Sequence, residues 1–151
     1  MYFIQWLFYL IPLCLPSKVF QLGQGQVTRY TLMEFRHFFS VYFHHIDTQA
    51  QDRFHTHAFN SYAWVLSGGY TDVTRDGIKH EYRAGDLRYI PREFNHKLTK
   101  ALPDTLTLLV TGPYAGIWTE ELDNGTLLVL TQHHKILYRA MPLLSPAKPK
   151  T

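Results

Sequence analysis

The chain has 151 residues, of which 46% are hydrophobic and 15% aromatic, enough apolar material for the core of one domain and too much for a disordered chain. Lysine and arginine exceed aspartate and glutamate by only 15 to 12, and no stretch is dominated by basic residues, so nucleic-acid binding through a broad basic patch is not supported. A single cysteine, Cys14, excludes an internal disulfide framework and a zinc knuckle or ribbon, and it fits a reducing, cytoplasmic location.

The N-terminal segment is almost entirely apolar from Met1 to Pro16. No basic residue precedes this run, no small-residue cleavage site follows it, and it is shorter than the roughly 20 residues that span a bilayer. Pro12 argues against a long helix over Ile4–Leu15. We therefore expect residues 1–24 to pack on the rest of the fold or on a partner subunit, with membrane association as the less favoured alternative.

Residues 25–142 are predicted to form one all-β domain, because short apolar runs alternate there with turns rich in Gly, Pro, Asn and Asp. Asp76-Gly77 is a strong hairpin signal between two of these runs. Besides the N-terminal run, only Lys135–Met141 could be helical, and residues 143–151 are expected to fray. The predicted strands are Val27–Phe35, Phe38–Ile46, Arg53–His57, Ser61–Leu66, Tyr70–Arg75, Lys79–Tyr82, Leu87–Ile90, His96–Leu98, Thr105–Thr111 and Leu127–Thr131.

Three histidines carry the chemical signal. His55 and His57 are two positions apart, so on an extended chain both imidazoles lie on the same face and can hold one metal ion. Such a pair is weak evidence when it stands alone. Downstream, a tight turn at Gly85-Asp86, a short strand, Pro91 and then His96 follow in that order, which would bring a third imidazole to the first two.

This order of residues resembles the two motifs of the cupin superfamily. The first is H-x-H, then three or four residues, a glutamate, six residues and a glycine; the second is a glycine, five residues, P-x-G, two residues and a histidine. His55, His57 and Gly69 match the first motif, and Gly85, Pro91 and His96 match the second. The resemblance covers about Arg53 to Leu98 and implies a cupin-like β-barrel, or jelly roll, that forms a homodimer.

Two positions depart from the cupin pattern. Tyr62 stands at the position assigned to the motif glutamate, and Glu93 stands at the second glycine of the second motif. The resemblance then implies three histidine ligands with an open fourth position, as in the cysteine-dioxygenase-like cupins. Tyr62 could be a weak ligand, donate a hydrogen bond to a substrate, or pack.

Three neutral imidazoles suit a divalent transition metal, with Fe(II) expected here and Zn, Ni or Mn as alternatives. Iron would permit oxygen activation and zinc would activate a bound water. The leading expectation is therefore a mononuclear iron-dependent dioxygenase acting on a small molecule. His55, His57 and His96 would be the ligands, and Tyr62 and a nearby arginine, Arg88, would orient the substrate.

Two other functions stay open at the level of sequence. The barrel could be a non-catalytic module that binds a small molecule or serves assembly. It could also be a metal-independent isomerase or epimerase that uses a histidine as base. His44-His45 lies on the predicted strand Phe38–Ile46, where alternation turns one of the two inward. A core histidine is the expectation there, with a second metal site or a supporting role beside the ligands as the alternative.

Overall fold

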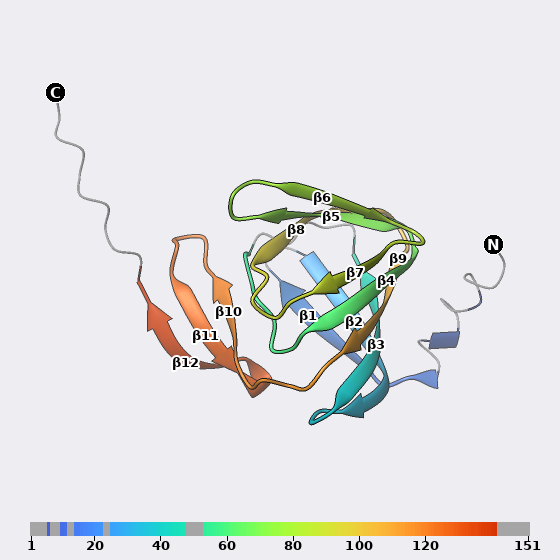
Figure 1. The fold of residues 1–151 in the computed structure, drawn as a ribbon, viewed down its shortest axis with the longest axis horizontal. Coiled ribbons are helices and arrows are strands. Elements are labelled where there is room, and N and C mark those ends of the chain that lie inside the picture. Colours follow the sequence, from blue (N-terminus) through green and yellow to red (C-terminus); the bar gives the residue numbers. More distant parts are fainter. Residues whose placement is uncertain (1–5, 7–9, 12–13, 23–24, 48–52, 142–151) are drawn as a thin grey trace.

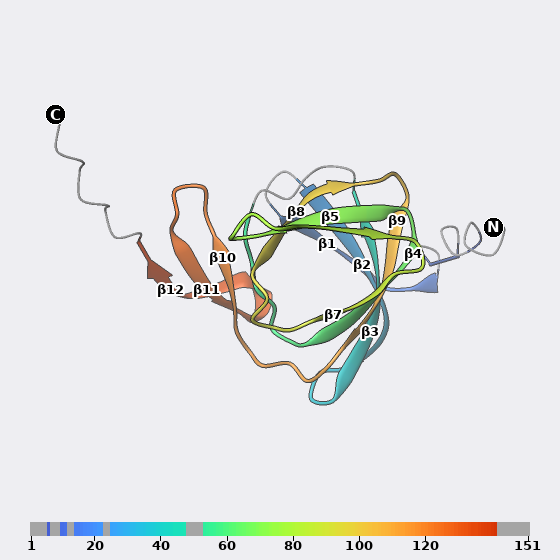
Figure 2. The ribbon, with the colours of Figure 1, turned by 45° about the horizontal axis from the view of Figure 1, so that its top comes forward.

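The computed structural model describes residues 6, 10–11, 14–22, 25–47 and 53–141. In its described part the elements are twelve β-strands and one short 3₁₀ turn, η1 (Gln132–His134), and Trp6, Leu10, Ile11 and Cys14 have helical backbone. Strands β1 to β9 surround one interior, and β10 to β12 stand beside this barrel (Figures 1 and 2). The strands are β1 (Ser17–Leu22), β2 (Gly25–Phe35), β3 (Phe39–Ile46), β4 (Ser61–Ser67), β5 (Gly69–Thr74), β6 (Lys79–Arg83), β7 (Leu87–Ile90), β8 (His96–Ala101), β9 (Thr105–Thr111), β10 (Trp118–Glu121), β11 (Leu127–Thr131) and β12 (Lys135–Ala140).

The barrel consists of two antiparallel sheets. The larger has the order β1-β2-β3-β9-β4-β7, and the smaller has the order β6-β5-β8. Neighbours such as β3 and β9 are far apart in sequence, so the chain crosses repeatedly from one sheet to the other, as in a jelly roll. The third sheet, β10-β11-β12, pairs consecutive strands. The predicted all-β, jelly-roll architecture is therefore confirmed.

Alternation along the strands decides which side chains reach the interior. On β4, Ser61, Ala63 and Val65 are buried, whereas Tyr62 and Trp64 point outward. This is the two-residue period of a strand with one face in the core. The buried apolar residues form two clusters, one around Val27, Ile46, Val65, Tyr70 and Ala101 and one around Tyr42, Ala63, Ile90 and Leu109.

Turn chemistry fixes the register of the barrel strands. The predicted hairpin at Asp76-Gly77 is present, because β5 pairs antiparallel with β6 and Gly77 has φ +85°. Gly68, between β4 and β5, has φ +67°, and a Cβ atom there would lie 2.4 Å from the hydroxyl of buried Thr105. Only glycine fits that bend, which leads the chain from the large sheet into the small one.

The structure differs from the predicted elements in four places. Residues 17–22, within the segment expected to pack on the barrel, form an edge strand of its large sheet instead. Lys135–Met141 is not helical: β12 covers most of it and pairs with β11, whose Val129 and Leu130 flank a register shift. Strand β10 was not predicted, and Arg53–His57 forms isolated bridges at His55 rather than a strand.

Some predictions fall largely outside the described residues. They are the N-terminal run before residue 14, of which the structure describes only Trp6, Leu10 and Ile11, and the tail over residues 143–151. Within the described part of the chain, no helix has the length and apolar character needed to cross a membrane.

Candidate metal centre

The H-x-H segment is held in place by main-chain hydrogen bonds on both sides. His55 and His96 exchange two of them, with N···O distances of 2.9 and 3.2 Å, and His55 also bridges to Glu120 of β10. The amide of Thr56 donates to Thr119, and the amide of His57 donates to Arg92. The segment thus joins β8 to β10, and the backbone sets the positions of the imidazoles.

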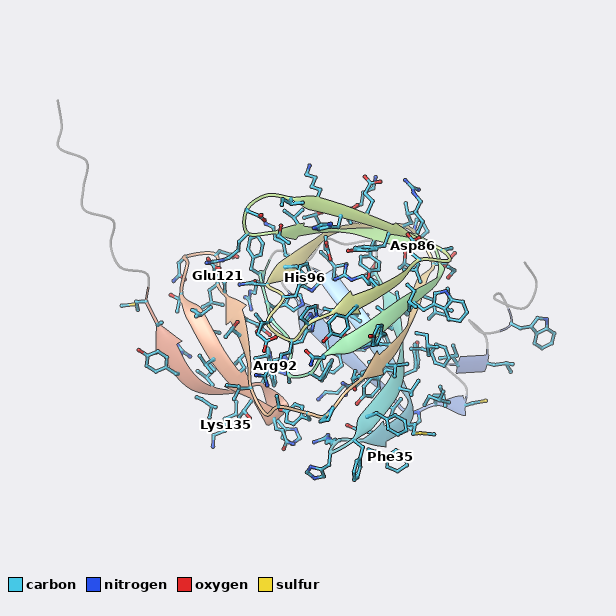
Figure 3. All side chains as sticks on the ribbon, in the orientation of Figure 1. Phe35, Asp86, Arg92, His96, Glu121 and Lys135 are labelled. Carbon is cyan, nitrogen blue, oxygen red and sulfur yellow. The ribbon has the colours of Figure 1, made fainter. Side chains whose placement is uncertain are left out.

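The three predicted histidines meet in space. Their ring centroids form a near-equilateral triangle with sides of 4.9, 5.1 and 5.2 Å. One ring nitrogen from each lies within 4.8 Å of the other two, and Nε2 of His57 is 3.0 Å from Nε2 of His96. His96 lies inside the outline of the barrel, away from peripheral Phe35 and Lys135 (Figure 3). In the described part of the chain, no other set of three potential metal ligands comes this close.

A buried carboxylate determines which nitrogen of His96 faces the other histidines. Asp72 on β5 is fully buried, and its Oδ2 accepts a hydrogen bond of 2.9 Å from Nδ1 of His96. Burial favours a higher pKa for Asp72, but hydrogen bonds from His96 and Arg88 outweigh it and lower that pKa. Because ionised Asp72 can only accept, His96 carries its proton on Nδ1, and its Nε2 lone pair is free for the centre.

His55 is oriented in the same way by the main chain. Its Nδ1 lies 3.2 Å from the carbonyl oxygen of Arg53, which can only accept a hydrogen bond. This leaves Nε2 of His55 as the nitrogen with a free lone pair. Two of the three imidazoles therefore have their outer nitrogen engaged, which is the usual arrangement of histidines that bind metals.

Burial keeps all three imidazoles uncharged. It lowers the pKa of His55 to about 4, assisted by nearby His96. Burial and the neighbouring histidines lower the pKa of His57 well below its usual value, and burial also lowers that of His96 despite opposition from Asp72. Metals bind the neutral form of imidazole, so the donors are in the required state at neutral pH.

The centre opens into a cavity of about 290 Å³ inside the barrel. The cavity wall is mostly apolar and aromatic, with contributions from Tyr42, Phe59, Ile90, Leu109 and Trp118. This size and lining suit a small organic molecule.

The predicted role of Tyr62 beside a substrate does not fit the structure. Its side chain is 54% exposed, its ring packs on Tyr89 with centroids 5.0 Å apart, and it is not part of the cavity wall. Ser61, the residue before Tyr62, is buried and faces the cavity instead. A motif that allows three or four residues before the glutamate cannot choose between the two, whereas strand alternation can.

Arg88 also has a different place from the predicted one. It is buried, forms an ion pair with Asp72, and lies over the ring of Tyr82 with its guanidinium carbon 4.3 Å from the centroid. It does not line the cavity. Arg88 therefore acts on the centre through Asp72 and is a positioning residue rather than a substrate contact.

Two buried carboxylates near the centre have no counterpart in the predicted site. Asp72 is one, because its link to His96 follows from the pairing of β5 with β8. Glu120 is a buried carboxylate of the cavity wall. His44 also lines the cavity, as one member of the His44-His45 pair was expected to, but it is not one of the three clustered donors.

Comparison with known proteins supports the fold. No family model matches the sequence, and no curated protein sequence does either. Among solved structures, a sugar phosphate isomerase of the cupin superfamily from Silicibacter pomeroyi superposes with a TM-score of 0.59 at 16% identity, over 90% of this chain and 94% of that one. This chain has the cupin fold.

Two further cupin-fold structures agree. The polyketide cyclase RemF from Streptomyces resistomycificus has a TM-score of 0.56 at 15% identity, over 89% of this chain and 84% of that one. The EutQ protein of Clostridium difficile has a TM-score of 0.52 at 19% identity, over 63% of this chain and 75% of that one. The resemblance in the motifs is thus confirmed in three dimensions, and the three-histidine group could hold a metal, as cupin centres often do.

Proposed function

We propose that this cupin-fold chain is a mononuclear metal enzyme that acts on a small organic molecule, with Fe(II) as the metal and dioxygen as co-substrate. The observation that carries the proposal is the triangle of three neutral imidazoles at the wall of a cavity whose surface is mostly apolar. His55, His57 and His96 would hold the ion.

The donor set fits a divalent transition metal. Two imidazole nitrogens bound about 2.1 Å from one ion lie roughly 3.0–3.4 Å apart. Nε2 of His57 and Nε2 of His96 are already 3.0 Å apart, and the widest spread within the group is 4.8 Å. When bound, Fe(II) with three protein ligands would supply open positions for dioxygen and substrate.

The surrounding residues have defined tasks. Asp72, itself held by Arg88, fixes the tautomer and orientation of His96. The Arg53 carbonyl does the same for His55. The apolar part of the cavity wall would contact the body of the substrate.

The structural neighbours support an enzyme rather than a purely structural module. Two that align over about nine-tenths of this chain are described as a sugar phosphate isomerase and a polyketide cyclase. Both names denote chemistry on small molecules. Their reactions differ from each other, so the reaction of this chain is inferred from its own donor set.

The test uses nitric oxide as an analogue of dioxygen. Chelator-treated, untagged protein would be loaded with Fe(II) without oxygen and exposed to nitric oxide, and the paramagnetic resonance signal of the adduct recorded. We expect a signal from the wild type and none from the His55→Ala/His57→Ala variant. A wild type that binds Fe(II) but gives no adduct would contradict oxygen chemistry and leave metal binding standing.

One observation favours a second candidate, metal-free acid–base catalysis. A buried aspartate hydrogen-bonded to Nδ1 of a histidine is the arrangement that holds a catalytic base, and Asp72 and His96 have it. Such an isomerase-like activity would survive chelators and be abolished by His96→Ala. The proposed metal enzyme would lose its activity in both treatments.

A further inference from the structure

A row of polar side chains crosses the large sheet on the wall of the cavity. The register places Lys18 of β1 opposite Arg29 of β2, Arg29 opposite His44 of β3, and His44 opposite Thr107 of β9. All four residues line the cavity. Side chains directly opposite each other on neighbouring strands have Cβ atoms about 4.5–5.5 Å apart, so the row is continuous.

Arg29 in this row has a hydrogen-bond donor without a partner. Its guanidinium carbon lies 4.8 Å from the ring centroid of Phe20 and 4.5 Å from that of Tyr42. Its Nε is buried without a hydrogen-bond partner, and among the described residues no carboxylate comes within 4.0 Å of it. Burial lowers the pKa of Arg29, yet arginine stays charged at neutral pH.

Arg36 provides the contrast. It also lines the cavity, but its Nε donates to Glu34 over 2.8 Å, and that carboxylate also accepts from the hydroxyl of Tyr42 over 3.4 Å. Glu34 is thus engaged with Arg36 rather than with Arg29. A buried N–H group without a hydrogen-bond partner costs free energy, so the unpaired Nε of Arg29 points to a ligand that completes it.

His44 next to Arg29 is also incomplete. Its Nε2 is buried and has no partner. Burial, with a contribution from Arg29, lowers the pKa of His44 to about 3, so the ring is neutral and adds no charge to the row. The positive charge therefore comes from Arg29 and from Lys18, whose Nζ lies 5.1 Å from the same Phe20 ring.

We infer that Lys18 and Arg29 bind the anionic end of the substrate, a carboxylate or a phosphate monoester, beside His44 in the cavity that also holds the histidine centre. A guanidinium donates two parallel hydrogen bonds to either anion. On either side of this row are two cross-strand pairs of apolar residues, Val27 with Ile46 and Tyr42 with Leu109, and these would contact the body of the molecule. The inference rests on the proposed function and adds the charge of its substrate.

The experiment compares anions with a neutral molecule of similar shape. Benzoate, phenyl phosphate and benzyl alcohol would be titrated into the full-length, untagged protein by calorimetry. We expect at least one anion to bind about tenfold or more tightly than the alcohol, as charge-assisted hydrogen bonds require. The better of the two anions identifies the head group.

Variants of Arg29 and Arg36 test whether Arg29 causes the preference for anions over the alcohol. Arg29→Met should reduce anion affinity to that of the alcohol, whereas Arg36→Met, the matched cavity arginine that already has a partner, should leave it unchanged. If Arg29→Met does not fold, Arg29→Lys replaces it and should bind the anions more weakly than the wild type. No anion preference in the wild type, or a preference that survives the Arg29 substitution, would overturn the inference.

Metal binding is separated by a second set of titrations. The anions would be titrated into chelator-treated wild type and into the His55→Ala/His57→Ala variant. Anion binding that depends on Arg29 and persists in both would support the row even if the metal enzyme proposal fails. Anion binding that disappears in both would show that the metal holds the anion and would overturn the assignment to Arg29.

Discussion

At the scale of single residues, Asp72 connects the stability of the barrel with the state of the centre. It accepts hydrogen bonds from His96 and from buried Arg88, so one carboxylate both orients a donor and neutralises a cation. Its Oδ1 is buried without a partner, so Oδ2 receives both contacts. Removing this charge should therefore affect metal affinity and folding together.

Asp72→Asn is expected to weaken metal binding by about 10- to 100-fold, because the amide can no longer hold His96 in the required tautomer. It should also lower the free energy of unfolding by on the order of 3 kcal/mol, since Arg88 would be left buried and unpaired. Competition titration with a chromophoric chelator and urea unfolding measure the two effects. Asp123→Asn, at an exposed loop aspartate, serves as the control.

The double variant Asp72→Asn/Arg88→Met separates the two effects. Removing the cation should restore much of the lost stability, because no unpaired charge stays buried. It should not restore metal affinity, since the neutral amide, which can donate as well as accept, still does not fix the tautomer of His96. Metal affinity that returns with stability would show that Asp72 acts only on folding.

His44 predicts how stability changes with pH. Its pKa is lowered to about 3 in the folded protein, against about 6.5 in the unfolded chain. The unfolded state therefore binds this proton first, and stability is lost as the pH falls from about 6.5 towards 3, by about 1.4 kcal/mol per pH unit for this one group.

Urea unfolding of chelator-treated protein between about pH 7 and pH 4.5 tests this. His44→Gln should show a shallower loss of stability on acidification than the wild type. His37→Gln, at an exposed histidine, should behave like the wild type. Equal slopes in wild type and His44→Gln would mean that His44 titrates normally in the folded state.

At the scale of elements, the first residues of β4 decide how many ligands the centre has. Ser61 is buried and faces the cavity, and Tyr62 faces solvent. The resemblance to cupins places a glutamate in this region, and only the inward position could use it. The serine there leaves the centre with three imidazole donors.

Ser61→Glu is expected to tighten metal binding by roughly tenfold or more, because it adds a carboxylate ligand on the inward face. It should also destabilise the metal-free protein, since a charge would be buried without a partner. Tyr62→Glu is the matched control and should change neither quantity. The reverse result, with tighter binding only in Tyr62→Glu, would mean that the inward face of β4 is wrongly assigned.

The sequence predicts the elements better than it predicts their contacts. The predicted strand Leu87–Ile90 and the Asp76-Gly77 hairpin are present as expected, because period-two alternation and turn residues are local signals. The motif spacing allows either Ser61 or Tyr62 at the glutamate position, so it does not reveal that Ser61 is the residue that faces the cavity. Asp72 was missed because its approach to His96 depends on how β5 pairs with β8, which no local signal reveals.

At the scale of the whole molecule, the expected homodimer stays a prediction. Exposed apolar side chains gather on β2, β3 and the turn between them: Leu32, Met33, Phe35, Phe38 and Phe39. Several exposed apolar side chains on one hairpin are typical of a contact with another protein. Light scattering coupled to gel filtration should give twice the 17.7 kDa chain mass. A mass of one chain at all concentrations would contradict the dimer.

Metal content is the most direct test of the three-histidine centre, because His55 and His57 come from the H-x-H segment and His96 comes from β8, and only the assembled barrel brings them together. It would be measured by mass spectrometry on untagged protein purified without chelators, beside His55→Ala/His57→Ala. We predict about one transition-metal ion per chain, lost in the variant. Less than about a tenth of an equivalent in the wild type, still so after reconstitution with Fe(II), would contradict the three-histidine metal centre.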